Sequence, residues 1–174
     1  MSTLYLRIAA CAAVVASFLS FTASQSPASA REVVAFNGGA SPGTIVVRTQ
    51  ERKLYLVLRD GRALRYTVGV GRVGRQWAGR SYIDGKHVRP AWAPPADIRR
   101  DKPSLPAMIP GGSPSNPMGV AALTLSGGDY AIHGTNQPGS IGGFVSYGCI
   151  RMHNHDIVDL YDRVGVGTPV IVTR

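Results

Sequence analysis

Residues 44–70 carry the sequence TIVVRTQERKLYLVLRDGRALRYTVGV, which is the clearest indication of fold class in the chain. Residues 44–48 and 54–58 are short runs rich in β-branched and apolar side chains, which is typical of strands. The dipeptide Asp60-Gly61 is a favoured two-residue hairpin turn, and residues 64–70 return as the next strand. The stretch therefore predicts an antiparallel meander of three strands.

Further strands and a single helix are expected downstream. Residues 120–125 and 130–133 predict two short strands, and residues 169–173 predict the last strand. A helix is expected to begin at Asn154, a capping residue, and to stop at Gly165. Its apolar side chains recur at helical spacing at Ile157, Leu160, Tyr161 and Val164. The chain is therefore expected to be mostly β with one α-helix.

Residues 71–118 are dense in Gly, Pro and Arg, which breaks helices and central strands, so we expect long loops on a β scaffold. Loops of this length in a compact domain are usually functional or disordered. Just before them, residues 69–74 read GVGRVG and match the dinucleotide-binding fingerprint. Residues 75–79 show no apolar helical period, and no acidic residue closes a second strand downstream. Hairpin glycines are therefore the better interpretation.

Residues 1–30 have the three parts of a secretory signal peptide. Arg7 precedes an apolar run over residues 8–21, and Ala28-Ser29-Ala30 forms an Ala-x-Ala exit. The alternative is a retained membrane anchor, but the run is shorter than the roughly 20 residues of a spanning helix. A lipoprotein is a weaker option, because the box ending at Cys11 precedes most of the apolar run. We expect export and cleavage after Ala30.

The remaining chain is expected to hold a linker over residues 31–43 and one domain over residues 44–174. Loss of Arg7, the only charge in residues 1–30, changes the formal net charge from +9 to +8. Such a balance suits an acidic polymer, and export argues against nucleic acid. The alternative is that the charge only keeps the protein soluble. We expect a monomer.

Cysteine use narrows the function. Cys11 leaves with the signal peptide, so the exported domain keeps Cys149 as its lone thiol. A lone thiol in an oxidising compartment cannot form an internal disulfide. It is tolerated if it is buried and inert, or if it carries out chemistry.

The neighbourhood of Cys149 favours chemistry. His133 closes a predicted strand, and Cys149 follows across a Gly-rich loop. A thiol attacks as thiolate, so it needs a nearby base or positive charge, which His133 and Arg151 supply. Gly148 permits a sharp turn that exposes the amides of Gly148 and Cys149 for a developing oxyanion. His133 alone is more often a hydrogen-bonded histidine at a strand end, but the pair favours catalysis.

These motifs resemble the catalytic domain of the L,D-transpeptidases, also called the YkuD family. The family signature is His-Gly-Thr or His-Gly-Ser, then a spacer, then Ser-His-Gly-Cys followed by Ile or Val and Arg or Asn. This chain has HGT at residues 133–135 and SYGCIR at residues 146–151. The likeness extends to residues 68–71, 92–95, 109–112 and 116–119, and covers roughly residues 44–172.

The resemblance implies a β-sandwich of mixed sheets with one helix and a cleft near Cys149. Cys149 would attack the carbonyl of the third, diamino-acid residue of a peptidoglycan tetrapeptide stem and release the terminal D-Ala. An amine of a second stem, or of a wall-anchored protein, would resolve the thioester. His133 would be the base, and the backbone carbonyl of Gly134 would orient its ring. Ser146 and Arg151 match motif positions that support the site.

Two departures from the family pattern stand out. Tyr147 replaces the usual His before Gly-Cys, and we interpret it as a tolerated neighbour whose hydroxyl still hydrogen-bonds. Residues 76–79, QWAG, replace the common Thr-Pro-x-Gly loop, which changes substrate contacts but removes no catalytic group. Two alternatives remain open: an L,D-carboxypeptidase with water as acceptor, and a non-catalytic peptidoglycan-binding protein. The expected address is the periplasm or cell wall.

Other chemistries are disfavoured. His133, Cys149, His153 and His155 have the residue types of a zinc site, but their spacing fits no strong pattern. Papain-like wall endopeptidases place Cys before His, which is the reverse of the order in this chain. We therefore expect a reaction that uses neither a metal nor an organic cofactor.

Overall fold

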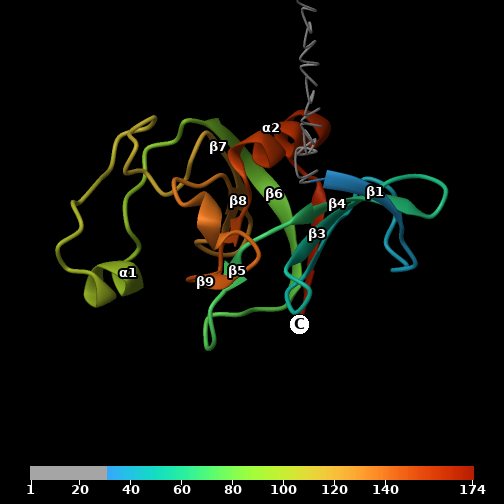
Figure 1. Cartoon of the computed structure of the whole chain (residues 1–174), viewed down its shortest axis with the longest axis horizontal. Helices are drawn as coiled ribbons and strands as arrows, with labels where there is room; N and C mark the ends of the chain where they lie inside the picture. Colours follow the sequence, from blue (N-terminus) through green and yellow to red (C-terminus); the bar gives the residue numbers. More distant parts are fainter. Residues whose placement is uncertain (1–30) are drawn as a thin grey trace, which may run out of the picture.

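The computed structural model describes residues 31–174, which form a mostly β structure (Figure 1). Residues 1–30, where we expect the signal peptide, lie outside the described residues. Within residues 31–174, no helix is long and apolar enough to cross a membrane.

The strands share a nine-stranded mixed sheet in the order β1-β4-β3-β2-β11-β6-β7-β8-β10, with β5 and β9 forming a separate pair. The pairs β11–β2, β10–β8 and β5–β9 are parallel, and the other pairs are antiparallel. In chain order the elements are β1 (Arg31–Ala35), β2 (Ile45–Arg48), β3 (Lys53–Val57), β4 (Arg62–Thr67), β5 (Val70–Gly71), β6 (Gly79–Val88), α1 (Ala96–Asp101), β7 (Ala121–Leu125), β8 (Ala131–His133), the 3₁₀ turn η1 (Pro138–Ser140), β9 (Phe144–Ser146), β10 (Ile150–Arg151), α2 (Asn154–Arg163) and β11 (Pro169–Thr173).

The expected meander is confirmed in β2, β3 and β4, which pair antiparallel in succession. Asp60 and Gly61 both have positive φ, at 60° and 64°, as a type I′ hairpin turn requires. The turn twists in the same sense as the strands that it joins, so the register of the hairpin is fixed locally.

The segment expected to be a linker, residues 31–43, is only partly one. Arg31–Ala35 form β1, which pairs antiparallel with β4 along its whole length, and Phe36 behind it is buried. The sequence did not predict this strand, because the two adjacent valines Val33 and Val34 are too few to indicate a strand and a Gly-rich stretch follows them. Backbone hydrogen bonds to the edge of β4, not an apolar pattern, hold this strand in place.

The stretch expected to be all loop, residues 71–118, contains β6 and the short helix α1. Ile83 is the buried residue of β6, so the strand lacks the alternation that marks a half-buried strand. The first half of β6 pairs with β11 and the second half with β7, and its register shifts between Ile83 and Gly85. This central strand joins the two halves of the sheet.

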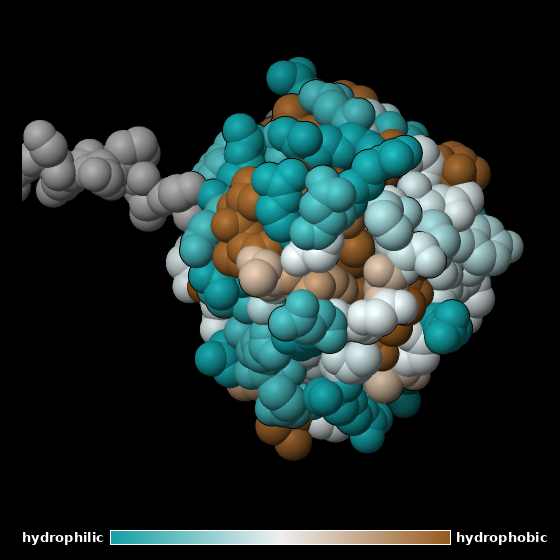
Figure 2. Space-filling model, turned by 90° about the vertical axis from the view of Figure 1, so that its right-hand side faces the viewer, coloured by the Kyte–Doolittle hydropathy of each residue, from teal (hydrophilic) through white to brown (hydrophobic). Residues whose placement is uncertain are grey.

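One apolar core is shared by both halves of the sheet and by α2. Ile45 and Leu54 from the meander pack in the same cluster as Ile132 from β8 and Leu160 from α2. The sheet therefore folds around at β6 and encloses the core, which confirms the expected sandwich with its principal helix (Figure 1). On the face shown in Figure 2, apolar surface is interspersed with hydrophilic surface.

Helix α2 starts where we expected, but Asn154 does not cap it. His153 is the N-cap residue, and no side chain bonds to the free N–H groups at this end. Asn154 instead accepts hydrogen bonds through Oδ1 from the Thr135 N–H at 3.0 Å and the Val120 N–H at 3.4 Å. It thereby joins the helix to the segments that follow β8 and precede β7.

Candidate active site

The pairing of β8 with β10 brings the two predicted catalytic residues together. These strands run parallel, with Ile150 opposite Ile132 and Arg151 opposite His133. Both isoleucines are buried in the core. Because side chains alternate along a strand, His133 and Arg151 lie on the other face of the sheet.

Cys149 directly precedes β10 and therefore comes alongside Ala131, on the same face as His133. His133 lies two residues further along the neighbouring strand. Strand spacing and rise place their Cα atoms about 8 Å apart, which is within the combined reach of an imidazole and a thiol side chain. In this structure the Cys149 thiol donates to the Asp129 carbonyl oxygen, with Sγ 3.8 Å from it. The fold thus brings the two residues together across the loop that separates them in sequence.

The ring of His133 is buried and oriented. The residue is 4% exposed, and its Nδ1 lies 2.6 Å from the carbonyl oxygen of Gly134. Nδ1 is therefore the protonated nitrogen and donates to Gly134, which leaves Nε2 free to accept a proton. This geometry agrees with the orienting role expected for the Gly134 carbonyl. Burial, aided by the positive charge of Arg151, lowers the pKa of His133 to about 4.

Cys149 is partly exposed at a cavity. Burial is the main cause that raises the pKa of the Cys149 thiol, while the positive charge of Arg151 acts in the opposite direction. Both shifts favour a neutral thiol beside a neutral imidazole in the resting protein.

Ser146 holds the turn that carries Cys149. Its buried Oγ donates to the Cys149 carbonyl oxygen at 2.6 Å and accepts from the Gly148 N–H at 3.1 Å. Gly148 has φ of 123°, and a Cβ there would lie 2.3 Å from Cε1 of Tyr130. The turn therefore requires glycine at this position.

The structure contradicts the oxyanion role expected for the Gly148 amide. That N–H already donates to Ser146 Oγ, so it is not free for a substrate oxygen. The N–H of Cys149 itself has no acceptor among the hydrogen bonds within residues 31–174. This amide is therefore available to donate to a substrate carbonyl oxygen bound beside the sulfur.

Two aromatic residues that sequence reasoning did not select support the same turn. Trp77 donates from Nε1 to the Gly148 carbonyl at 3.0 Å and stacks on Tyr130 with ring centroids 5.0 Å apart. Trp77 belongs to residues 76–79, the loop in which we expected altered substrate contacts. The one feature of the sequence that could have indicated a role for Trp77 is that it is an aromatic residue within a Gly-rich loop.

Tyr147 ties the catalytic turn to α1. Its hydroxyl donates to Asp101 at 2.8 Å, as expected for a hydroxyl that replaces the usual imidazole. The guanidinium groups of Arg72 and Arg75 lie 4.0 and 5.2 Å from its ring centroid. Arg72 also pairs with Asp101 at 2.8 Å, and Arg75 pairs with Asp97 of the same helix at 2.7 Å. This cluster fixes α1 beside the nucleophile.

A cavity of about 620 Å³ opens at Cys149, and we call it the Cys149 cavity. Its walls include Trp92, Ile98 of α1, Met118, Tyr130 and Tyr147. Three acidic residues, Asp84, Asp97 and Asp129, also line it, together with Arg75. A cleft of this size with both apolar and charged walls suits a short peptide.

Arg151 contributes to the site through its backbone and its charge. Its N–H and carbonyl both pair with Gly69, at 2.8 and 2.9 Å, which anchors β10 to the segment before β5. Its Nε is buried and has no hydrogen-bond partner within the part of the chain that the structure describes. The guanidinium charge therefore acts on the sulfur of Cys149 without being neutralised by a carboxylate.

The residues considered for other chemistries occupy ordinary structural positions. His153 and His155 stack on each other at the start of α2, with centroids 5.3 Å apart. No three His, Cys, Asp or Glu side chains within residues 31–174 are grouped as metal ligands. In the GVGRVG stretch, Gly74 has φ of 78° in a tight turn and no helix follows, which agrees with the rejection of a dinucleotide-binding site. The turn is not a hairpin, because β5 pairs with β9 and β6 pairs with β11 and β7.

Comparison with known proteins gives a family match. A family model described as YkuD, L,D-transpeptidase catalytic domain, matches residues 42–172. The probable L,D-transpeptidase ErfK/SrfK of Escherichia coli is 42% identical over 135 residues, which are 72% of this chain and 42% of that protein. The putative L,D-transpeptidase YkuD of Bacillus licheniformis is 35% identical, over 79% of this chain and 69% of that protein. This chain thus spans less than half the length of the first of these relatives.

Solved structures give the same fold at low sequence identity. The catalytic domain of the E. faecium L,D-transpeptidase superposes with a TM-score of 0.60 at 20% identity, over 78% of this chain and all of that one. L,D-transpeptidase 3 from Mycobacterium tuberculosis superposes with a TM-score of 0.57 at 16% identity, over 75% of this chain and 60% of that one.

Proposed function

The chain belongs to the YkuD family, that of the L,D-transpeptidase catalytic domain, and on this premise we propose that it is a peptidoglycan L,D-transpeptidase with Cys149 as nucleophile. The observation that carries the proposal is the shared sheet face of Cys149 and His133, with Cys149 at the edge of a peptide-sized cavity. A thiol and a neutral imidazole placed in this way are the two groups that acyl transfer requires.

In the first half-reaction, Nε2 of His133 takes the proton of the Cys149 thiol as the sulfur attacks. The sulfur bonds to the carbonyl carbon of the third, diamino-acid residue of a tetrapeptide stem. The Cys149 N–H donates to the oxyanion, and the positive charge of Arg151 stabilises negative charge at the site. The C–N bond to the terminal D-Ala then breaks, and His133 returns the proton to the leaving amine.

In the second half-reaction, a neutral amine attacks the thioester carbonyl carbon. His133 takes the proton of this amine, a new amide bond forms, and the Cys149 thiolate leaves. The thiolate then recovers the proton from His133, which restores the neutral pair. The amine would come from a second stem or from a wall-anchored protein.

The supporting residues act by holding the nucleophile in place. Ser146 and Trp77 fix the turn that carries the sulfur. Tyr147 fixes α1, and with it one wall of the cavity. The Gly134 carbonyl keeps the ring of His133 in the tautomer that exposes Nε2.

We also place the protein outside the cytoplasm, at the cell wall. Residues 1–30 have the pattern of a signal peptide, and the rest of the chain carries a formal charge of +8, after loss of Arg7 from a total of +9. A positive protein is attracted to an anionic wall polymer.

The test is to incubate the purified protein with disaccharide-tetrapeptide stems and to analyse the products by mass spectrometry. We expect cross-linked dimers that lack one D-Ala, and none with Cys149→Ala. The matched control is Ser140→Ala, which removes a hydroxyl from the neighbouring loop between β8 and β9 and should retain activity. If tripeptides are the sole products, the protein is an L,D-carboxypeptidase and the proposal is wrong. Binding of the stems without any product would replace it with a non-catalytic binder.

A further inference from the structure

We propose that a second cavity, beside the end of β8 and lined by Arg89, binds a carboxylate-bearing stem peptide of the wall polymer other than the stem being acylated. This inference rests on the proposed function, because it takes peptidoglycan as the substrate. The cavity measures about 440 Å³ and is called the Arg89 cavity below. It is lined by neither Cys149 nor His133.

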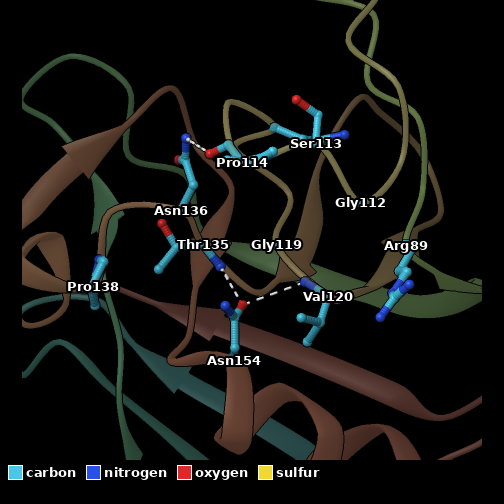
Figure 3. A pocket seen from close by; sticks show the side chains of 11 residues that line it. Arg89, Gly112, Ser113, Pro114, Gly119, Val120, Thr135, Asn136, Pro138 and Asn154 are labelled. Atoms are coloured by element: carbon cyan, nitrogen blue, oxygen red, sulfur yellow. Dashed lines mark hydrogen bonds between the residues drawn. The ribbon is translucent and has the colours of Figure 1, made fainter.

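The Arg89 cavity lies where three segments distant in sequence meet (Figure 3). Residues 112–114 and 119–120 form one side, Thr135 and Asn136 form another, and Asn154 closes the cavity at the start of α2. These polar side chains and backbone groups suit a peptide better than an apolar ligand.

The charge of this cavity favours an anion. Arg89 is its one charged lining residue, and no acidic residue is among the lining residues. The guanidinium of Arg89 makes no ion pair or hydrogen bond with any other part of residues 31–174, so its charge is available to a ligand. Arginine binds carboxylates through two parallel hydrogen bonds. The Cys149 cavity, by contrast, has three acidic lining residues.

The backbone at Arg89 is held in an unusual conformation. Arg89 has φ of 45°, which is uncommon for a residue other than glycine. Its N–H donates to the Val120 carbonyl at 2.9 Å, and its own carbonyl packs against Gly111 so closely that a Cβ at Gly111 would overlap it. Strain of this kind persists where the surroundings fix it, often at binding sites. The backbone position of Arg89 in the lining of the cavity is therefore fixed by the loop.

Asn116 fixes the opposite end of the same loop. Its buried side chain donates from Nδ2 to the carbonyls of Pro90 and Pro110, at 2.9 and 3.0 Å. The residue after Arg89 is thereby tied to the segment that leads into residues 112–114. Two walls of the cavity are held together by one buried amide.

Two further amides present groups for a peptide backbone. Oδ1 of Asn154 already accepts the Thr135 and Val120 N–H groups, whereas its Nδ2 donates to no acceptor in the described chain (Figure 3). Nδ2 of Asn136 donates to the Pro114 carbonyl at 3.2 Å, and its Oδ1 has no donor there. A free donor and a free acceptor beside an unpaired arginine match a peptide that carries a carboxylate.

One short segment of the chain contributes to both cavities. Met118 lines the Cys149 cavity, while Asn116 and Gly119 on either side of it line the Arg89 cavity. A polymer that repeats its stem peptides can therefore place one stem in each cavity. Binding of the second stem becomes intramolecular, which raises the effective concentration of the first stem at the nucleophile.

The test uses the full chain with Cys149→Ala, so that binding is measured without turnover. The probe is a disaccharide-tetrapeptide stem, followed by amide NMR shifts and by titration. We expect shifts at Gly119, Thr135 and Asn136, and an affinity for this site about tenfold weaker when Arg89→Gln is added. The control change is Arg80→Gln, at an exposed arginine of β6 that lines neither cavity.

A second probe is the same stem with its carboxylates amidated. We expect the Cys149→Ala protein to bind this amidated stem at the Arg89 cavity about tenfold more weakly than the unmodified stem, which is the loss expected for Arg89→Gln. Equal affinity of the two probes, or no shifts at the Arg89 cavity, would overturn this inference. Cross-linking by the wild-type protein is measured separately. If cross-linking occurs without binding at the Arg89 cavity, this inference fails and the proposed function stands. If binding occurs there without cross-linking, the proposed function fails instead.

Discussion

Replacement of Ser146 by alanine removes one buried hydroxyl from the turn that carries the nucleophile. Ser146 is 2% exposed, so water cannot take the place of its Oγ. The variant loses the 2.6 Å bond to the Cys149 carbonyl and leaves the Gly148 N–H without its 3.1 Å acceptor. Both losses fall on the two residues that set the position of the sulfur.

The expected cost follows from these two bonds. A buried N–H left without a partner costs about 1–3 kcal/mol, and a lost hydrogen bond adds about 1 kcal/mol. We expect the free energy of unfolding to fall by about 3 kcal/mol. At about 2–4 °C per kcal/mol, the midpoint of thermal unfolding should fall by roughly 6–12 °C. Acylation should also slow, because the turn is no longer held in one geometry.

The assays are thermal unfolding by circular dichroism and the rate of acylation by a carbapenem, both compared with Ser140→Ala. Ser140 donates to the Gln137 carbonyl in a solvent-exposed position, so its loss should change the free energy of unfolding by less than about 0.5 kcal/mol. A Ser146→Ala variant that melts and is acylated like Ser140→Ala would refute this account of the turn.

Three further predictions concern the base, the cleft wall and the meander. The pKa of His133 in the folded protein, about 4, is below its ordinary value of 6.5, so the unfolded chain binds the proton at a higher pH than the folded protein does. The free energy of unfolding should therefore fall by about 3 kcal/mol as the pH drops from 6.5 to 4. Urea unfolding should show this loss in the wild type and not in His133→Gln. Tyr147→Phe keeps the ring beside the arginines but loses the bond to Asp101, which should raise KM for a tetrapeptide stem severalfold with kcat nearly unchanged. Gly61→Ala places a Cβ at φ of 64° and should cost about 1 kcal/mol of stability without changing the acylation rate.

Each of these predictions has a contrary result. The same pH dependence in His133→Gln as in the wild type would mean that this ring is not the buried neutral group described here. A Tyr147→Phe variant with unchanged KM would mean that the bond between Tyr147 and α1 does not contribute to substrate binding. Acylation that slows in Gly61→Ala would mean that the hairpin at Asp60-Gly61 is coupled to the catalytic turn.

Local pattern was enough to predict the meander and the principal helix. The strands β2, β3 and β4 follow one another, and the turn at Asp60-Gly61 needs only two residues of suitable type. In contrast, β1 is held by backbone bonds to β4, and β6 carries one buried side chain, Ile83. Neither strand has an apolar period, because neither depends mainly on burial for its place in the sheet.

The proposed catalytic pair could be selected from residue type, but the residues that support it could not. A lone thiol and a histidine flanking a Gly-rich loop are informative in themselves, so Cys149 and His133 could be selected as candidates. The bond from Trp77 to Gly148 joins residues that are 71 positions apart, and nothing local to either residue marks it. The Gly148 amide was misassigned because its partner, Ser146 Oγ, depends on how the side chain turns back over the loop.

Intact-mass analysis after exposure to a carbapenem asks most directly whether the sulfur at the start of β10 is the nucleophile. We predict that the wild-type protein gains one carbapenem mass, located on the peptide that contains Cys149. Cys149→Ala should gain no mass, and His133→Gln should gain it far more slowly. An unmodified wild-type protein, or an adduct that persists in Cys149→Ala, would contradict the assignment.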